Sequence, residues 1–425
     1  MTARRGVAVE VWADWSLLPS PARVGTLHVA TARGRDTFSF EYDAAWLASG
    51  RAPALDPALE LVRGRQFAAA DRTTFGVFLD SCPDRWGRML MQRRETQLAR
   101  SARRAERRLG EVDFLLGVFD GHRLGGLRYR IGDGPFLDDN AALASPPWTS
   151  LAELEQASLA LERDGAERSR HYSAWLGLLI APGRSLGGAR PKASVVDGDG
   201  RLWMAKFPSA HDADDIGAWE SVVHALAVRA KIQTAEATRR RFGGRHHTFL
   251  SRRFDRAADG RRIHFASAMT MLDRVDGAAS EGASYVDLAR VVVQRGAHPA
   301  RDLEELWRRI AFFACVSNVD DHLRNHGFVL EAAGWALAPA YDMNPVATAG
   351  GLALNISETD NAQDLELVRD VAGQFRVKRA RATQILAEVV AAARGWRAEA
   401  KRLKLARAAI DRMSGAFRVA DDARP

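Results

Sequence analysis

Apolar and polar residues alternate along the first part of the chain, and this alternation predicts β-strands. β-Branched and aromatic residues are enriched in three short runs, which Gly, Pro and Asp separate from one another. From residue 75 to 108 the pattern becomes helical and rich in arginine. The three predicted strands are 6–12, 26–31 and 37–42.

The middle of the chain predicts a loop, a helical stretch and a second group of strands. Residues 133–148 are rich in Gly, Pro and Asp, which is typical of a loop or linker, and residues 149–180 have a mostly helical pattern. A helix over 216–230 interrupts the second β-rich block, and acidic residues precede it, as suits a helix N-terminus. The predicted strands of this block are 193–197, 201–207 and 247–254.

From residue 284 onward the pattern is helical, with one short β interlude. Residues 327–339 predict a hairpin, whereas the flanking stretches carry apolar residues at three- to four-residue spacing. No internal repeat and no low-complexity tract is evident. The predicted helical stretches are 284–295, 303–316 and 377–413.

Composition and charge narrow the class of protein. The 425 residues are 47% hydrophobic and 27% charged, as in folded globular proteins. The 61 Lys and Arg residues against 53 Asp and Glu give a net charge of +8, which fits either an anionic partner or ordinary solubility charge. Cys82 and Cys315 are the only cysteines, so no disulfide framework is predicted.

The chain shows no sign of a membrane segment or of a signal peptide. Glu10 and Asp14 break the apolar stretch at the start, and the strongest apolar run, 172–183, is too short to span a bilayer. We therefore expect a cytoplasmic protein.

The densest polar cluster, SNVDDHLRNHG at 317–327, lies between a predicted buried helix and the predicted hairpin. Asp320 and Asn325 are five residues apart, and Asp342 follows the second strand of the hairpin. This order is typical of kinase-like phosphoryl transfer, in which the first Asp orients or deprotonates the attacking hydroxyl. The Asn and the second Asp then supply the hard oxygen ligands that Mg²⁺ prefers. The cluster therefore favours a phosphoryl-transfer site.

A glycine-rich segment, PGRSLGGARPKASVV at 182–196, precedes a predicted strand. Gly183, Gly187 and Gly188 would let backbone amides approach a phosphate closely. The segment also matches the nucleophile-elbow pattern G-x-S-x-G with Ser185 as an esterase nucleophile, but the required helix does not follow. A plain surface turn is a third interpretation.

Lys206 ends the predicted strand 201–207, and Glu220 opens the predicted helix 216–230. Kinases pair a strand lysine that holds the α- and β-phosphates with a helix glutamate, although an arbitrary lysine at a strand end remains an alternative. A zinc hydrolase using His322 and His326 is a further alternative, but Leu323 stands where the H-E-x-x-H motif requires Glu. The elements together follow the order found in kinases.

Over nearly its whole length the chain resembles the HipA family of serine/threonine kinase toxins, which belong to type II toxin–antitoxin systems. Several motifs in the same order carry this resemblance. They are FGVFLDSCPDRWGRMLM (75–91), DFLLGVFDGHRLGGLRY (113–129), SLGGARPKASV (185–195), WMAKFPS (203–209), FLSRRFDR (249–256), SYVDLA (284–289), NVDDHLRNHGF (318–328) and LAPAYDMNP (337–345).

The resemblance implies Mg–ATP-dependent phosphorylation of a protein serine or threonine and assigns roles by position. Asp320 would be the catalytic residue, and Asn325 and Asp342 would ligate Mg²⁺. Ser185 matches the loop serine whose autophosphorylation silences the kinase, and a phosphate there adds about −1.5 to −2 charge beside the ATP phosphates. Asp321 differs from the best-known member, and we expect its side chain to face solvent. The residues expected to bind the nucleotide are Gly187, Gly188, Ala189, Lys192, Lys206, Arg252, Phe254 and His322, with Glu220 in support.

The resemblance also implies an α+β fold, namely a kinase-like two-lobe fold with a small β-rich N-terminal subdomain and a mainly helical C-terminal lobe. We expect the β-rich subdomain over 1–135, an N-lobe-like region with the Gly-rich loop over 136–270, and a helical lobe with the catalytic loop over 271–425.

Family members usually bind a small helix-turn-helix antitoxin of the HipB type, and the complex then sits on operator DNA. We expect the same partners here, together with a protein substrate, which in characterised relatives is an aminoacyl-tRNA synthetase. The Arg-rich segment 93–108 is either a solvated helix face or a source of additional DNA phosphate contacts. The alternative to an active kinase is a catalytically silent regulator that has a kinase-like fold and binds antitoxin and DNA.

Overall fold

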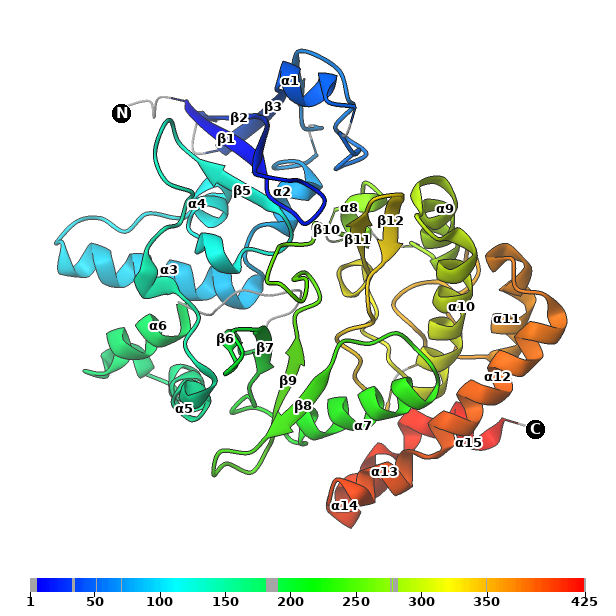
Figure 1. The fold of residues 1–425 in the computed structure, drawn as a ribbon. Coiled ribbons are helices and arrows are strands. Elements are labelled where there is room, and N and C mark those ends of the chain that lie inside the picture. The colour runs from blue at the N-terminus through cyan, green and yellow to red at the C-terminus, as the bar shows by residue number, and fades with distance from the viewer. Residues whose placement is uncertain are drawn as a thin grey trace. The chain divides into compact units, whose positions relative to one another are not determined.

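The chain folds into two compact units in the computed structural model (Figure 1). Unit 1 comprises residues 1–210, 253–266 and 273–275, and unit 2 comprises residues 211–252, 267–272 and 276–425. The chain therefore leaves unit 1 and re-enters it twice. The structure describes residues 6–32, 35–50, 52–69, 71–180, 190–275, 277, 282–348 and 350–423.

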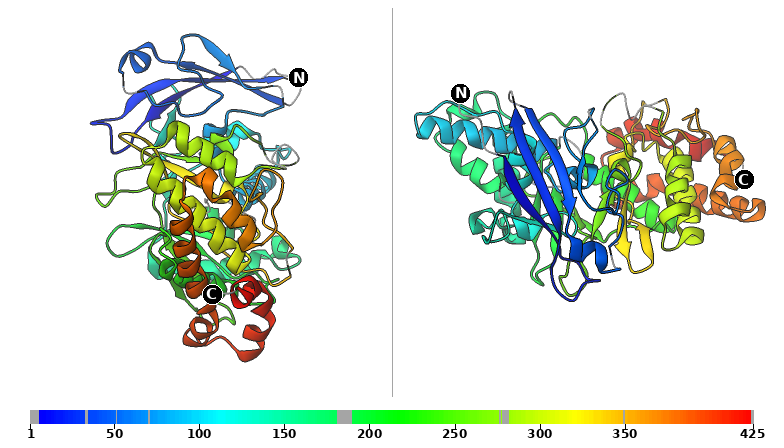
Figure 2. Two further views of the ribbon diagram at one scale, coloured as in Figure 1. Left: turned by 90° about the vertical axis from the view of Figure 1, so that its right-hand side faces the viewer. Right: turned by 90° about the horizontal axis from the view of Figure 1, so that it is seen from above.

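A five-stranded antiparallel sheet in the order β4-β3-β2-β1-β5 forms the first part of unit 1, and Figure 2 shows β1, β2 and β3 side by side in blue. Val9 and Val11 are fully buried whereas Glu10 between them is half-buried, as the alternation predicted. The three strands predicted here are confirmed. The strands are β1 (Val7–Ala13), β2 (Ala22–Ala32), β3 (Arg35–Tyr42), β4 (Arg65–Phe67) and β5 (Leu127–Arg130).

The helices of unit 1 are shorter than the helical pattern predicted. The Arg-rich stretch leaves its helix at Ser101, because Arg103 adopts a left-handed backbone conformation and the chain then turns back. Arg104 and the backbone N–H of Arg107 donate hydrogen bonds to the buried carboxylate of Glu95. These helices are α1 (Ala44–Ala48), α2 (Gly76–Asp80), α3 (Arg85–Ser101), α4 (Glu111–Leu116), α5 (Leu151–Leu161) and α6 (Tyr172–Ile180).

Each unit also contains antiparallel strand pairs. In unit 1, β6 (Lys192–Val196) pairs with β7 (Leu202–Lys206). In unit 2, β8 (Ala237–Arg240) pairs with β9 (Thr248–Arg252), and helix α7 (Ile216–Arg229) packs on both strands. The predicted acidic start of α7 is confirmed, because the Asp215 side chain accepts a hydrogen bond from the Ala218 N–H.

The rest of unit 2 is mainly helical, and its long helix α10 packs beside α9 (Figure 2). Trp307, Ile310 and Ala314 of α10 are fully buried, so this helix forms the centre of the unit's core. The predicted hairpin is confirmed as β11 and β12. The remaining elements are β10 (Phe265–Ser267), α8 (Ala268–Met271), α9 (Tyr285–Arg295), α10 (Pro299–Val316), β11 (Gly327–Glu331), β12 (Gly334–Leu337), α11 (Leu365–Asp370), α12 (Arg379–Arg394), α13 (Trp396–Arg402), α14 (Arg407–Met413) and α15 (Arg418–Asp422).

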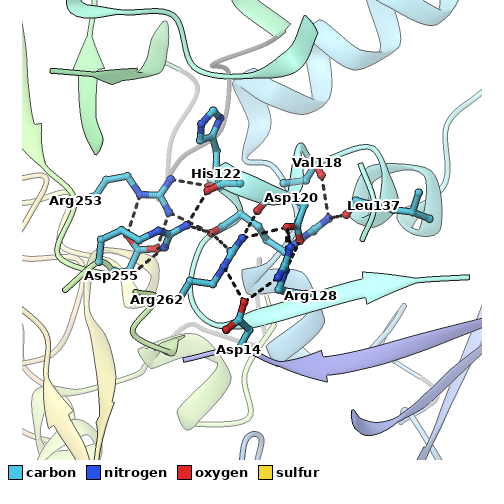
Figure 3. Close-up of polar contacts among 12 residues, drawn as sticks. Asp14, Val118, Asp120, His122, Arg128, Leu137, Arg253, Asp255 and Arg262 are labelled. Carbon is cyan, nitrogen blue, oxygen red and sulfur yellow. Dashed lines mark hydrogen bonds and ion pairs between the residues drawn. The ribbon is translucent and has the colours of Figure 1, made fainter. Parts of the chain in front are cut away.

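A network of arginines and aspartates ties residues 253–262 to the earlier part of unit 1 (Figure 3). Asp255 is 1% exposed and accepts hydrogen bonds from both Arg253 and Arg256. Burial alone would raise the pKa of Asp255, but the two guanidinium groups lower it well below its usual range. Arg262 in turn donates to the buried Asp120. Unit 1 therefore depends on charge pairs that join distant parts of the sequence.

No helix among the described residues combines the length and the apolar character that crossing a lipid bilayer requires.

Candidate functional site

The predicted catalytic segment begins where helix α10 ends. Ser317, the residue that follows α10, adopts a left-handed conformation (φ 47°), which turns the chain sharply away from the helix axis. The Asn318 side chain then accepts a hydrogen bond from the Asn344 N–H (2.8 Å), and Val346 N–H donates to Ser317 O (3.1 Å). The chain after the hairpin is thereby fixed against the chain before it.

These contacts bring the turns that carry Asn325 and Asp342 together. Tyr341, next to Asp342, donates its hydroxyl to the backbone carbonyl of Arg324, next to Asn325 (2.8 Å). Asp342 itself has a left-handed backbone (φ 56°), and its carboxylate accepts a hydrogen bond from the Asn344 side chain (3.2 Å). A non-glycine residue in this conformation is strained and persists where its surroundings hold it.

The Asn325 side chain is fixed at one end and unpartnered at the other. Its amide nitrogen donates to the backbone carbonyl of Asp320 at 2.6 Å, which orients the side chain. Its amide oxygen is buried and accepts no hydrogen bond from any residue that the structure describes. Such an oxygen is a hard ligand of the kind that Mg²⁺ prefers, so this turn fits the predicted magnesium site.

Asp320 differs from its neighbours because its side chain is 80% exposed. Its carboxylate lies 3.9 Å from Nε2 of His322, and the other ring nitrogen of His322 is buried without a hydrogen-bond partner in the described part of the chain. Asp320 thus presents an exposed carboxylate on a turn that the Asn325 amide holds in place. Asp320, His322, Asn325 and Asp342 therefore belong to one pair of linked turns in unit 2.

The expectation that Asp321 faces solvent is wrong. Asp321 is 1% exposed, and its carboxylate accepts hydrogen bonds from the Tyr285 hydroxyl and from the Ala353 N–H. Desolvation by burial raises the pKa of Asp321 to about 7. Its backbone carbonyl accepts from the buried His326 ring (3.2 Å). Asp321 therefore fixes the segment to the protein interior, whereas the neighbouring Asp320 side chain is exposed to solvent.

We expect Asp321→Asn to change how stability depends on pH. Because the folded pKa lies above the unfolded one, the stability that Asp321 contributes is present below about pH 4 and is lost as pH rises through about 7. The loss amounts to at most about 1.4 kcal/mol per pH unit within that window. The free energy of unfolding, measured in urea from pH 5 to 8, should fall more steeply for the wild type than for Asp321→Asn. Equal slopes would show that the pKa of Asp321 is not raised in the folded protein.

His326 has a packing role in the structure. It is 2% exposed, its ring lies edge-on to Tyr285 at 5.4 Å, and desolvation lowers its pKa to about 3. No group of three or more His, Cys, Asp or Glu side chains suited to a metal ion occurs among the described residues.

In unit 1, the two predicted phosphate-contacting lysines lie directly opposite each other in the β6–β7 hairpin. Lys192 pairs in register with Lys206, so both side chains point to the same face of the hairpin. Both lysines are buried, and Nζ of Lys192 lies 3.0 Å from the carboxylate of Asp84. That carboxylate also caps helix α3 by accepting from the Gly87 N–H. Sequence reasoning missed Asp84, whose only signal was its place in the motif at 75–91.

The other predicted positions are divided between the two units. Glu220 is 3% exposed on helix α7 of unit 2. Arg252 ends β9 in unit 2, where it is exposed and pairs with Glu236 (3.1 Å). Phe254 is half-buried in unit 1 with its ring 5.9 Å from that of Phe265. Ser185, Gly187, Gly188 and Ala189 lie outside the described residues.

Comparisons with known proteins support the sequence resemblance. The family model of the HipA-like C-terminal domain matches residues 184–396, which is half of the chain and contains Ser185, Lys206, Asp320, Asn325 and Asp342. No curated protein matches the chain.

Among solved structures, a chain of the Shewanella oneidensis MR-1 toxin–antitoxin complex of HipA, HipB and operator DNA aligns with a TM-score of 0.61. The two chains are 15% identical, and the alignment covers 94% of this chain and 95% of that one. The Helicobacter pylori proinflammatory kinase CtkA aligns with a TM-score of 0.36 and 10% identity, over 54% of this chain and 92% of that one. The Shewanella alignment confirms the predicted α+β, kinase-like fold. The three-part division of the chain and the roles of the site residues stay predictions.

Proposed function

The chain belongs to the HipA-like family, and from that premise we propose that it is a Mg–ATP-dependent protein serine/threonine kinase and the toxin of a toxin–antitoxin module. The observation that carries this proposal is the Asn325 side chain, whose buried oxygen has no donor in the described part of the chain. A buried amide oxygen without a partner is costly in a purely structural role. A bound cation would remove that cost.

Asn325 and Asp342 would hold Mg²⁺, which neutralises negative charge on the phosphates of ATP. The Asn325 oxygen is preoriented by the bond from its own amide group to the Asp320 carbonyl. The Asp342 carboxylate sits on a strained turn that Tyr341 and Asn344 hold in place. Carboxylate and amide oxygens, few in number, leave the remaining positions to water and phosphate, as is usual for this ion.

The buried lysine pair of unit 1 supports the nucleotide-binding part of the proposal. Both ammonium groups lie on the same face of the hairpin, where they form a locally positive surface. Asp84 compensates Lys192. Lys206 would contact the ATP phosphates, as the strand lysine does in kinases.

Asp320 would act on the attacking group. The hydroxyl oxygen of a serine or threonine forms a bond to the γ-phosphorus of ATP while the bond from that phosphorus to the bridging oxygen breaks, which releases ADP. The Asp320 carboxylate orients the hydroxyl and accepts its proton. Its 80% exposure leaves room for a protein substrate to approach.

The experiment that tests the activity is mass spectrometry of the purified chain after incubation with Mg–ATP. We propose that Ser185 is the residue that the chain phosphorylates on itself, and expect one added phosphate there. The same incubation with EDTA should add none, and Ser185→Ala should remove the modification without loss of folded protein. An unmodified wild type that nevertheless binds ATP would contradict self-phosphorylation.

Asn325→Ala should raise the Mg²⁺ concentration that half-maximal phosphorylation requires by roughly 10- to 100-fold, since one metal ligand is lost. Asn325→Asp keeps an oxygen ligand but loses the amide group that donates to the Asp320 carbonyl, so its magnesium affinity should lie between those of the wild type and Asn325→Ala. Phosphorylation rates measured across a magnesium titration give the comparison. If Asn325→Ala follows the wild-type curve, the side chain does not bind the metal.

We also propose that the chain binds a helix-turn-helix antitoxin of the HipB type and reaches operator DNA through it. The aligned Shewanella chain comes from a complex that contains HipB and operator DNA. The net charge of +8 is compatible with a place beside DNA.

A further inference from the structure

Unit 2 contains an arginine-lined pocket outside the residues assigned to phosphoryl transfer. Its volume is about 510 Å³, and helix α7, strands β8 and β9, and helix α13 contribute to its wall. No Asp or Glu is among the described residues that line it. Its charged wall consists of Arg239, Arg240 and Arg241 from one segment and Arg402 from α13, with His224 and His247 beside them.

Arg239 is a member of this group without a direct ion pair among the described residues. It is half-buried, whereas its strand neighbours Thr238 and Arg240 are exposed. Its guanidinium group makes no hydrogen bond and no ion pair within the part of the chain that the structure describes. Desolvation lowers the pKa of Arg239 and the positive charge of Arg402 lowers it further, whereas the charges of Asp215 and Glu399 act in the opposite direction without fully offsetting these effects. A partly desolvated cation that faces a second cation is unfavourable unless an anion joins them.

The nearest carboxylates are engaged elsewhere. Glu399 accepts hydrogen bonds from Arg229 and from Arg402. Asp215 accepts from the Ala218 N–H at the start of α7, and it pairs with the ring of His247. Neither carboxylate forms a hydrogen bond or an ion pair with Arg239 among the described residues.

We propose that this pocket binds a small phosphorylated molecule, with Arg239 and Arg402 contacting its phosphate group. Guanidinium groups match the oxygens of a phosphate with paired hydrogen bonds, and a phosphate here would place an anion between Arg239 and Arg402, the second of which already pairs with Glu399. The volume lies within the range of small-molecule sites, which is about 300–1,000 Å³. The proposal does not depend on kinase activity, since none of these residues belongs to the phosphoryl-transfer site.

Calorimetric titration with pyrophosphate tests the proposal. EDTA in the buffer removes magnesium, and constant ionic strength removes general charge effects. We expect saturable binding by the wild type and an affinity at least tenfold lower for Arg239→Gln. Arg407→Gln is the matched control, because it removes the same charge from unit 2 at a side chain that is 95% exposed, and it should bind as the wild type does. Equal affinities of the wild type and Arg239→Gln would overturn the proposal.

Thermal unfolding separates a binding role of Arg239 from a structural one. Because Arg239→Gln removes the repulsion from Arg402, its Tm without pyrophosphate should equal or exceed that of the wild type. Pyrophosphate should then raise the Tm of the wild type and leave that of the variant unchanged. A variant with a lower Tm that pyrophosphate raises as much as the wild type would show a structural role and overturn the proposal.

Discussion

Asp320→Asn is expected to lower the rate of Ser185 phosphorylation by about 10²- to 10⁴-fold, which is the usual contribution of a positioned proton acceptor. The amide keeps the shape of the side chain but cannot accept the proton of the attacking hydroxyl. Because the Asp320 side chain is 80% exposed, the substitution removes no packing, and the fold should be unchanged.

The measurement is the initial rate of phosphate incorporation by mass spectrometry, with circular dichroism to verify the fold. Asp411→Asn is the matched control, since it makes the same charge change at a side chain that is 70% exposed, and its rate should equal that of the wild type. A wild-type rate for Asp320→Asn would remove Asp320 from the mechanism. If the wild type and all variants bind Mg–ATP without any transfer, the chain is instead a silent regulator.

Asp255→Asn is expected to lower the free energy of unfolding by about 3–5 kcal/mol, the usual range for breaking a buried ion pair. The substitution leaves Arg253 and Arg256 next to a neutral side chain in a place that is closed to water. It also weakens the acceptor of the Gly125 N–H, which now bonds to the carboxylate at 2.9 Å.

Unfolding in guanidinium chloride, followed by tryptophan fluorescence, measures this loss. Asp259→Asn is the control within the same segment, because Asp259 is 52% exposed and pairs with Arg261 at the surface. Exposed ion pairs contribute little to stability, so the control should unfold close to the wild type. A small loss for Asp255→Asn would mean that the two arginines find other acceptors.

Local pattern was sufficient for the elements that hold the site. The alternation in β1 and β3, the helical spacing of α7 and α10, and the hairpin β11–β12 could all be predicted, because each is long or strongly patterned. Asp320, Asn325 and Asp342 stand at the ends of such elements, so their placement on neighbouring turns followed from the order of the elements. Short strands such as β8 carry too few residues for a periodic signal.

The contacts that distinguish similar residues could not be predicted. Asp320 and Asp321 are adjacent carboxylates, yet one is exposed and the other is buried against Tyr285 and Ala353. Tyr285 is 36 residues away in the sequence, and no local pattern indicates that its hydroxyl will meet Asp321. The same holds for Lys192 and Asp84, whose pairing depends on how α3 lies against the β6–β7 hairpin.

The chain leaves unit 1 and returns to it. This path determines how unit 1 could be produced separately from unit 2. A truncation after Ala210 would keep Asp120 and Gly125 but discard Arg262 and Asp255, their partners. Such a fragment would expose a buried carboxylate and a buried amide together, so we do not expect it to fold autonomously. A chain from which residues 211–252 are deleted, so that residue 253 follows residue 210 directly, would retain these pairs. Unit 1 can thus be isolated by deleting the intervening segment and rejoining the chain, but not by truncation at a single position.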